Sequence, residues 1–546
     1  MAFAELEGVR AFYRTGERVA LATVPLGTAR VVARRARGDV VEAEVGKGAS
    51  FEGLVSGTYS IEALAADGSV LAEELTTVGA HAGERPVHGF ATSFDPESVP
   101  TTLAWLRALR CTVVQIYDWM ASYSAPLGPV SGWKDPSNRD VSFQALSALA
   151  AGIRAAGAVA HAYAPIYAVD PPFAAAHPEL LMYRGDGGPE RLFDSILLAD
   201  PANPQWQRHF VSVYGEAADT IGFDGFHIDT YGFPRAALDQ QGSRIDMRAA
   251  YGSFLAHLRA ARPSDQISFN QVNGVPSAAE LPPGPGFRYC EVWPPNDQWR
   301  HLEGLMDRSA GHPSPRTVVP SLLRGTIACY PPVWGQGGGL PGPVERPARQ
   351  DALRTVLVTE AVATCLGASA LLYGDVNAVL CDPYYPKHER LSVSEAQTVM
   401  AWHRFALRCR DLFLEGEDTS WYEIGDDNGS VAVEWDGPVR PDPVGGALFA
   451  RVVRADDCVA VGIVDLTGSA DGLWSQPTAA GRCRSVRVRL LLEKPEMWAA
   501  EVATLGRAGS RFAPVGAAVV DHREGRAAEV VVPIEWGWSV LRMRCT

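Results

Sequence analysis

A chain of 546 residues is too long for one ordinary hydrophobic core, so two to four domains are expected. Hydrophobic residues make up 47% of the chain and charged residues 21%, which indicates a folded globular protein rather than a disordered one. The formal net charge of −14 argues against nucleic acid as a partner, because nucleic-acid-binding proteins need a basic surface.

The nine cysteines are scattered and show no CxxC or Cys/His ligand spacing, so the sequence predicts no metal site and no cofactor. No apolar run approaches the roughly 18 residues of a transmembrane helix, and no membrane span is expected. Residues Met1–Gly8 lack the basic and apolar regions of a signal peptide. We therefore expect a cytoplasmic protein, or a secreted one if a leader has been removed. The sequence does not indicate an oligomeric state.

The two ends of the chain have the alternating pattern of β-strands. Residues 1–86 alternate polar and apolar positions between Gly and Asp turns, as in Gly57–Leu64, and predict an immunoglobulin-like N-terminal β-sandwich. The alternation returns over residues 413–546, as in Val459–Leu466, and predicts a C-terminal antiparallel β-domain.

Residues 87–412 instead alternate apolar strand-like runs with amphipathic helices. A strand-helix unit repeated in this way is typical of a (β/α)8 barrel, whose active site lies at the carboxyl ends of its strands. The eight expected strands cover residues 89–94, 111–119, 158–169, 223–230, 267–273, 287–293, 316–322 and 369–375. The chain is thus expected to be a multidomain α/β protein, with a central TIM barrel flanked by two β-domains.

Six helices are expected between these strands, because their apolar residues recur at helical spacing. They cover residues 99–110, 142–156, 204–220, 245–262, 350–366 and 392–411. The Gly- and Pro-rich stretch 323–349 is expected to be a long loop, and loops of this length in compact domains are commonly functional.

Four acidic residues fall at the carboxyl ends of the expected strands, namely Asp118, Asp229, Glu291 and Asp375. Asp229 ends an apolar strand, and Glu291 lies between aromatic residues. Paired carboxylates beside Tyr and Trp rings suit glycoside hydrolysis, in which one acid attacks the anomeric carbon and the other protonates the leaving oxygen. A separation of about 5–6 Å would imply a covalent intermediate and retention, and about 6.5–9.5 Å inversion.

Further polar and aromatic residues near these strand ends are candidates for substrate binding, namely Tyr117, Asp118, Trp119, His227, Asn270, Asn273, Trp293 and Asp375. Asp118 between two aromatics indicates a ligand-facing acid, and the alternative is a salt-bridged acid with Trp119 in the core. His227 points into the barrel and could bind a hydroxyl, orient Asp229 or pack in the core. Asn270 could read hydroxyls or cap a turn.

At these residues the sequence resembles glycoside hydrolase family 66, the dextranases and cycloisomaltooligosaccharide glucanotransferases. The matching segments occur in the family's order and are Gln115–Trp119, Trp133–Asp135, Ala162–Tyr163, Ile166–Ala168, Asp200–Pro204, Gly222–Gly232, Asn270, Glu291–Trp293 and Tyr385–Pro386. The resemblance implies retaining cleavage of α-1,6-glucan, with Asp229 as the nucleophile and Glu291 as the general acid/base. It also implies that Tyr117, Asp118 and Tyr163 hold the sugar at the cleavage subsite.

The chain departs from the family pattern at two places near the expected site. Ala164 stands where the family tends to have Asn, and Met120–Ser124 replaces basic residues. Because a site that hydrogen-bonds a hydroxyl discriminates strongly, these changes leave the sugar less defined than the reaction. The stretch 323–349 leaves no room for the carbohydrate-binding module that the cyclising transferases insert there, which favours hydrolysis.

We therefore expect a retaining glycoside hydrolase that acts on α-glucosidic linkages of an oligosaccharide or polysaccharide. One alternative is a transglycosylase in which a sugar hydroxyl intercepts the same intermediate. Another is a carbohydrate-binding protein with a decayed active site, which the change at Ala164 keeps open. The remaining alternative is a metal-dependent hydrolase.

Overall fold

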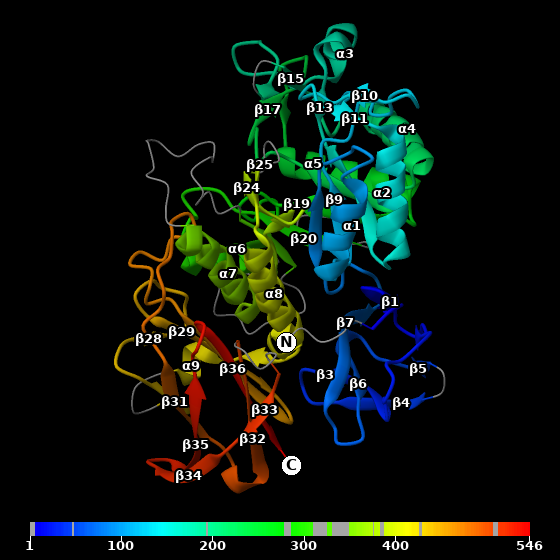
Figure 1. Ribbon diagram of the computed structural model, residues 1–546. Coiled ribbons are helices and arrows are strands. Elements are labelled where there is room, and N and C mark those ends of the chain that lie inside the picture. The colour runs from blue at the N-terminus through cyan, green and yellow to red at the C-terminus, as the bar shows by residue number, and fades with distance from the viewer. Residues whose placement is uncertain are drawn as a thin grey trace.

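The computed structural model describes residues 6–45, 48–192, 195–277, 286–309, 325–329, 349–374, 376–382, 387–424, 429–505 and 511–545. Figure 1 shows a central part of parallel strands and helices above two separate groups of strands. The N-terminal group is blue and the C-terminal group is orange to red.

Eight parallel strands form the central sheet, as the sequence predicts. Their order is β22 (Ser369–Leu371), β21 (Thr326–Ala328), β20 (Gly286–Glu291), β19 (Gln266–Asn270), β16 (Gly225–Asp229), β12 (Val159–Pro165), β9 (Val113–Ile116) and β8 (His88–Ala91). The end strands β22 and β8 are neighbours in space, so the sheet is a nearly closed barrel. The expectation of a (β/α)8 barrel is confirmed.

The seventh barrel strand differs from the sequence-based expectation. The segment 316–322 lies outside the described residues, and the seventh strand is β21, inside the stretch expected to be a loop. Gly325, with φ of 75°, leads into this strand, and its three residues are all buried. A run of three residues is too short to give a periodic signal, which explains why the strand was not anticipated.

The six expected helices form close to their predicted bounds. They are α1 (Val99–Ala108), α2 (Phe143–Ala155), α4 (Pro204–Ile221), α5 (Met247–Ala261), α7 (Arg349–Cys365) and α8 (Val393–Leu414). Helix α4 shows why the boundaries could be predicted. The Asn203 side chain accepts a hydrogen bond from the Gln205 amide, Pro204 takes the first helical position, and Gly222 ends the helix at φ of 93°.

Helix α6 (Trp299–Ser309) was not expected. Its buried face includes two acids, Glu303 and Asp307, and Glu303 accepts a hydrogen bond of 2.7 Å from the buried Arg451. Because acids occupy positions on the buried face, the apolar periodicity of this helix is interrupted. The remaining short elements are α3 (Pro171–Ala176), α9 (Ser420–Glu423), β10 (Trp133–Lys134), β11 (Asp140–Val141), β13 (Ala168–Val169), β14 (Arg191–Leu192), β15 (Ile196–Leu198), β17 (Ala237–Leu238), β18 (Arg244–Ile245), β23 (Tyr373–Gly374), β24 (Ala378–Asp382) and β25 (Lys387–Arg390).

The N-terminal strands form one seven-stranded sheet that folds over a shared core. Its order is β1 (Phe12–Arg14), β7 (Val70–Gly79), β6 (Gly57–Leu64), β3 (Arg30–Arg35), β4 (Val40–Val45), β5 (Ala49–Phe51) and β2 (Val19–Leu21). Strand β4 pairs first with β3 and then with β5, so the chain passes from one face of the core to the other. Val19 and Phe51 therefore pack with Val31 and Ile61, as in a β-sandwich.

The C-terminal strands form two sheets. The first contains β26 (Glu417–Asp418), β29 (Leu448–Ala455), β30 (Cys458–Asp465), β36 (Trp538–Cys545), β32 (Trp498–Thr504) and β33 (Ala513–Val515), with β28 (Val439–Arg440) beside β29. The second contains β27 (Val431–Glu434), β31 (Ser485–Leu491), β35 (Gly525–Pro533) and β34 (Ala517–His522). Val452 and Ile463 of the first sheet share a core with Val488 and Val532 of the second.

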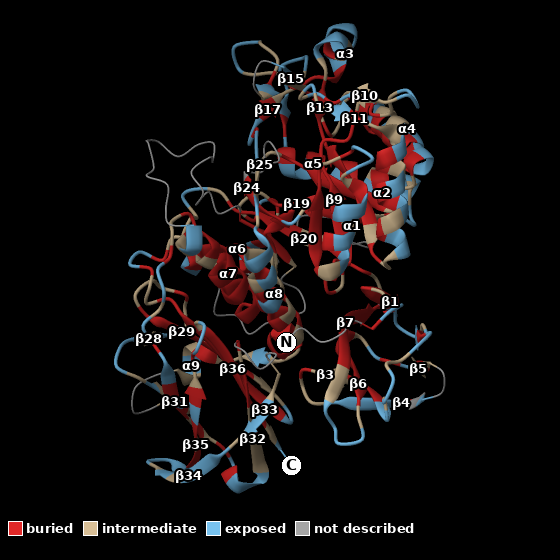
Figure 2. Cartoon of the chain, in the orientation of Figure 1, coloured by how far each residue is buried: buried red, intermediate tan, exposed pale blue. Residues whose placement is uncertain are grey.

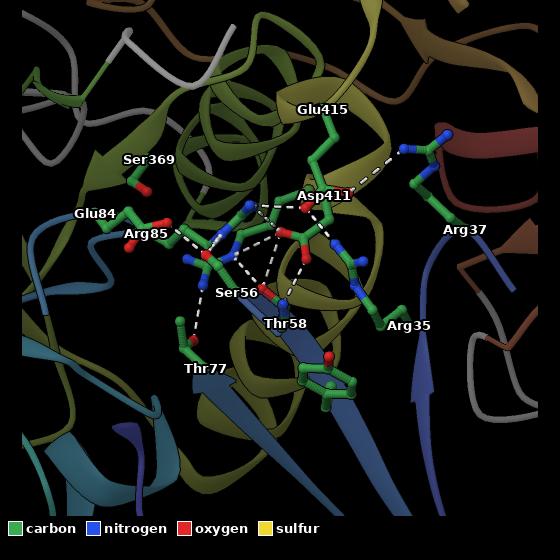
Figure 3. Close-up of polar contacts among 12 residues, drawn as sticks. Arg35, Arg37, Ser56, Thr58, Thr77, Glu84, Arg85, Ser369, Asp411 and Glu415 are labelled. Carbon is green, nitrogen blue, oxygen red and sulfur yellow. Dashed lines mark hydrogen bonds and ion pairs between the residues drawn. The ribbon is translucent and has the colours of Figure 1, made fainter. Parts of the chain in front are cut away.

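A buried polar cluster, called the junction cluster here, connects the N-terminal sheet to the end of α8 (Figure 3). Arg85, in the connection before β8, lies 3.0 Å from the Asp411 carboxylate and 2.7 Å from that of Glu415. The Thr58 hydroxyl on β6 donates to Asp411 at 3.0 Å and accepts from Arg410 at 2.9 Å. This cluster therefore fixes the N-terminal sheet against the last barrel helix.

Figure 2 shows the strands of the barrel buried, while the outer faces of α1, α2 and α4 are exposed. None of the helices in the described ranges combines the length and the apolar composition needed to cross a bilayer.

Candidate active site

Three adjacent parallel strands each end on a polar residue at the same end of the barrel. Asp229 is the last residue of β16, Asn270 the last of β19 and Glu291 the last of β20, and β19 lies between the other two strands. Their side chains are consequently placed side by side at the carboxyl ends of the strands, where barrel enzymes have their active sites. All three are buried.

The amide of Asn270 bridges the two acids. Its Nδ2 donates to Asp229 Oδ1 at 2.7 Å and to Glu291 Oε2 at 2.8 Å. Its Oδ1 accepts from the backbone amide of Glu291 at 3.3 Å, which is consistent with this orientation of the amide. Because both carboxylate oxygens contact one nitrogen, they lie at most about 5.5 Å apart.

Each acid also has a separate donor. The Tyr163 hydroxyl on β12 donates to Asp229 Oδ2 at 2.7 Å. The side chain of Trp293 hydrogen-bonds to Glu291. Each carboxyl group is thus held by a donor of its own, while Asn270 links the two.

The two acids differ in how readily they ionise. Burial raises the pKa of the Glu291 carboxyl to about 8, and the neighbouring Asp229 carboxylate adds to the rise. Burial also raises the pKa of Asp229, but hydrogen bonds from Tyr163, Asn270 and the backbone oppose this by stabilising its charged form. At neutral pH the pair can therefore hold its proton on Glu291 and its charge on Asp229.

A third acid lies beside the pair. Asp118 follows β9 at φ of 50°, an uncommon conformation for a residue other than Gly. Burial raises the pKa of its carboxyl to about 7, although Arg139 at 3.7 Å opposes the rise. Arg139 is itself held by Asp135, whose Oδ2 accepts from its Nε at 2.6 Å.

The aromatic rings expected at this site are in contact with one another. The rings of Tyr117 and Tyr163 have centroids 4.2 Å apart, and Tyr117 is the residue before Asp118. The structure thus brings Tyr117, Asp118 and Tyr163, which the family resemblance assigns to the cleavage subsite, close to the two candidate catalytic acids. The binding candidates Asn270 and Trp293 lie there as well.

Trp119 and His227 were predicted to bind substrate, and the structure places both of them in the core. Trp119 is 0% exposed, and its ring packs against Tyr214 and Phe223 on the outside of the barrel, so its ring is not available to a sugar. Its indole instead donates to the Tyr163 carbonyl at 3.0 Å. His227 lies one layer below Asp229, and its Nδ1 is 2.9 Å from the Ser268 hydroxyl, which agrees with the alternative of a packed core histidine.

Ala164 does not face the site either. Side chains alternate along a strand, and Tyr163 points inward to Asp229, so Ala164 points outward, where it is fully buried. The departure from the family pattern at this position therefore removes no group from the catalytic hollow. Asp375 lies outside the described residues.

Two residues of the site were not anticipated. The guanidinium of Arg139 lies 3.7 Å from the Asp118 carboxylate. Arg139 follows Asp135 by four residues and pairs with it, and this spacing is the sequence feature that could have indicated the ion pair. Tyr231, at φ of 47°, donates its backbone amide to Asp229 Oδ1 at 3.4 Å and its side chain hydrogen-bonds to Tyr163. Its position two residues after the nucleophile candidate could have indicated it. The described residues hold no group of three or more His, Cys, Asp or Glu side chains placed for a metal ion.

The sequence is similar to those of known enzymes. A cycloisomaltooligosaccharide glucanotransferase of Niallia circulans is 27% identical over 234 residues, which are 38% of this chain and 24% of the relative. A dextranase of Streptococcus salivarius is 26% identical over 305 residues, which are 49% of this chain and 36% of the relative. The matches thus span about a quarter to a third of the length of these curated relatives.

Among solved structures, a cycloisomaltooligosaccharide glucanotransferase of Paenibacillus sp., in complex with cycloisomaltoheptaose, has the same fold. It has a TM-score of 0.75 at 17% identity, and the match covers 100% of both chains. The model of glycosyl hydrolase family 66 matches residues 54–492, which is most of the sequence. The chain belongs to glycosyl hydrolase family 66.

Proposed function

We propose that the protein hydrolyses α-glucosidic linkages with retention of configuration, through a covalent intermediate on Asp229. The main support for this proposal is that the Asn270 side chain donates hydrogen bonds to both Asp229 and Glu291. Retaining enzymes have carboxyl groups about 5–5.5 Å apart, whereas inverting enzymes need about 6.5–9.5 Å to admit a water. The Asp229 and Glu291 oxygens that share the Asn270 nitrogen lie at most about 5.5 Å apart, which supports the closer spacing of retaining enzymes.

The first step forms the intermediate. An oxygen of the Asp229 carboxylate attacks the anomeric carbon while the bond from this carbon to the leaving oxygen breaks. The leaving oxygen takes the proton of Glu291, whose raised pKa keeps it protonated at neutral pH. The Tyr163 hydroxyl holds the attacking group in place through its bond to Asp229.

The second step releases the sugar. Formation of the ester neutralises Asp229, so the charge that helped to raise the pKa of Glu291 is gone. Glu291 can then act as a base, removing a proton from water as the water oxygen attacks the anomeric carbon. The ester bond breaks, Asp229 regains its charge and Glu291 again carries the proton.

The family supports α-glucan as the substrate, and the names of the relatives point to α-1,6 linkages of the dextran or isomaltooligosaccharide type. A carbohydrate-binding protein with a decayed site is less consistent with this chain. Both acids are present with their donors, and Ala164 points away from the hollow.

A second candidate is transglycosylation, because two of the relatives named above are glucanotransferases. Transfer would use the same intermediate on Asp229, with a sugar hydroxyl in place of water. At high isomaltooligosaccharide concentration it would produce oligomers longer than the substrate, whereas hydrolysis produces only shorter ones.

The test is a proton NMR time course on isomaltooligosaccharides and on dextran. We expect the α-anomer of the new reducing end to appear first, and the β-anomer to follow by mutarotation. Appearance of the β-anomer first would rule out retention. Binding of these sugars without any turnover would instead support the decayed site.

A further inference from the structure

A second hollow lies outside the barrel mouth, between α7, α8 and the C-terminal sheets. It has a volume of about 440 Å³, within the range of small-ligand pockets. Its floor is apolar and includes Leu353, Leu357 and Trp402. Trp536, in the turn between β35 and β36, lies at its edge and is 47% exposed. We call this hollow the Trp536 groove.

Exposure of so large an aromatic side chain is unusual, because its burial would remove a large apolar surface from water and stabilise the fold. In the described part of the chain, Trp536 is the one tryptophan among the exposed large hydrophobic residues. An exposed indole at the edge of an apolar hollow offers a flat surface to a ligand with an apolar face. The CH groups on one face of a pyranose ring form such a surface.

The polar residues of the groove divide into two groups. Asp465 accepts hydrogen bonds from Thr467 and the Cys483 amide, and Glu395 is held by Arg349 and Ser392. The carboxylates of Asp465 and Glu395 therefore already have hydrogen-bond partners within the protein. Arg354, which also lines the groove, is paired with Asp351 at 3.3 Å.

The second group is exposed and lines the groove: the Glu535 carboxylate, the Gln350 amide and the Arg484 guanidinium. It supplies both donors and acceptors, with one negative and one positive charge. This composition suits a neutral ligand with many hydroxyl groups better than an ion of either sign.

The position of the groove relates it to the catalytic acids. Gln350 lies in the first turn of α7, and Ser394 and Glu395 in the first turn of α8. In a (β/α)8 barrel the helices run antiparallel to the strands, so their first turns lie at the end where the strands finish. The groove therefore flanks the same end of the barrel as Asp229 and Glu291, and Figure 1 shows α7 and α8 next to the C-terminal strands.

We propose that the Trp536 groove is a second carbohydrate site, which binds a segment of an α-glucan chain away from the point of cleavage. The inference rests on the proposed function for its choice of sugar. Such a site holds long substrates near the active site without contacting the reacting bond. It therefore changes the use of polymer and leaves the use of short oligomers unaffected.

The experiment is affinity electrophoresis of the full chain in native gels that contain dextran or, in parallel, soluble starch. The Glu291→Gln variant serves as the background, so that the polymer is not degraded during the run. Into it are introduced Trp536→Ala and, on the opposite wall of the groove, Gln350→Ala. Tyr422→Ala removes another exposed aromatic side chain, on α9 and outside the groove lining, and is the matched control.

We expect Trp536→Ala to weaken retardation at least about fivefold in apparent Kd, Gln350→Ala to weaken it less, and Tyr422→Ala to leave it unchanged. In the active background, Trp536→Ala should raise KM for dextran and leave kcat/KM for isomaltotriose unchanged. Retardation that is absent from both gels, or that has the same apparent Kd after Trp536→Ala, would overturn the proposal. Failure of the proposed function is seen separately, as absent turnover of isomaltotriose by the unmodified chain.

Discussion

Two regions of this molecule contain buried carboxylates whose pKa values are shifted in opposite directions. At the barrel mouth, burial raises the pKa of Glu291 to about 8. Where the N-terminal sheet meets α8, burial also acts on Glu73, but Arg408 and Arg511 outweigh it and lower its pKa to about 2. Asp411 behaves like Glu73, because Arg85 and Arg410 outweigh the effect of burial.

The two regions differ in the groups that contact their carboxylates. The hydrogen bonds that the described residues give to the catalytic pair come from neutral groups, chiefly Asn270 and Tyr163. A neutral donor orients a carboxyl group without forcing it to ionise, whereas a guanidinium holds it charged over the whole physiological range. Within the junction cluster, Glu415 is the exception to this pattern. It shares Arg85 with Asp411, and burial and the Asp411 charge keep its pKa raised.

The largest effect is expected from neutralising the catalytic pair. Asp229→Asn and Glu291→Gln should each lower kcat by about three to five orders of magnitude, because the nucleophile or the acid is lost. The thermal unfolding midpoint should stay within a few degrees of the parent. On an aryl glycoside with a highly acidic leaving group, Glu291→Gln should lose far less in the first step than Asp229→Asn, since that leaving group needs no proton. Near-parental turnover in either variant would contradict the assignment.

A substitution in the junction cluster should lower the stability of the protein and leave its kcat nearly unchanged. Asp411→Asn leaves the buried Arg410 without its counter-charge and Arg85 with Glu415 as its remaining acidic partner, and should lower the free energy of unfolding by about 3–5 kcal/mol. The kcat of the molecules that remain folded should be within a factor of two of the parent. Urea unfolding followed by tryptophan fluorescence measures the first quantity, and active-site-normalised kinetics the second. An unchanged unfolding midpoint would mean that these ion pairs do not stabilise the junction.

Removing the bridge should have an intermediate effect. Asn270→Ala should lower kcat by about a hundredfold, because the two carboxyl groups lose their common donor. The Asn270 bonds lower the pKa of both acids, so their loss should move the pH profile of kcat/KM to higher pH. In the parent, activity should rise as Asp229 ionises and fall as Glu291 loses its proton near pH 8. Asn203→Ala removes an amide that caps α4 and should leave the profile unchanged.

The smallest effect is expected at the third acid. Among the described residues, Arg139 is the main group that lowers the pKa of Asp118, which burial raises to about 7. Arg139→Met should therefore raise this pKa further, leave Asp118 protonated at neutral pH and increase KM about tenfold with little change in kcat. Initial-rate kinetics between pH 5 and pH 9 measure this change. Arg184→Met breaks an exposed ion pair with Asp186 and is the control; equal effects of the two variants would leave Arg139 without a role at the site.

Much of this could be predicted from the sequence, because the relevant signals are local. Apolar strands that end on Asp229 and Glu291 indicate both the barrel and the end at which its chemistry occurs. What could not be predicted depends on direction and on distant partners. Trp119 follows the same strand as Asp118 but points outward, and only the packing against Tyr214 reveals it. The bridging role of Asn270 likewise requires the order of the strands, which a pattern of residues does not contain.

The order of the central sheet has one further consequence. The strands that carry Tyr163, Asp229, Asn270 and Glu291 are consecutive, from β12 to β20, and each is paired with the next along its length. The seam between β22 and β8, where the described residues form no strand pairing, lies elsewhere on the ring. We therefore expect local opening of the barrel to occur at this seam, away from the catalytic acids. Amide hydrogens along the seam should exchange with solvent at temperatures that leave the spacing of the two acids, and with it turnover, undisturbed.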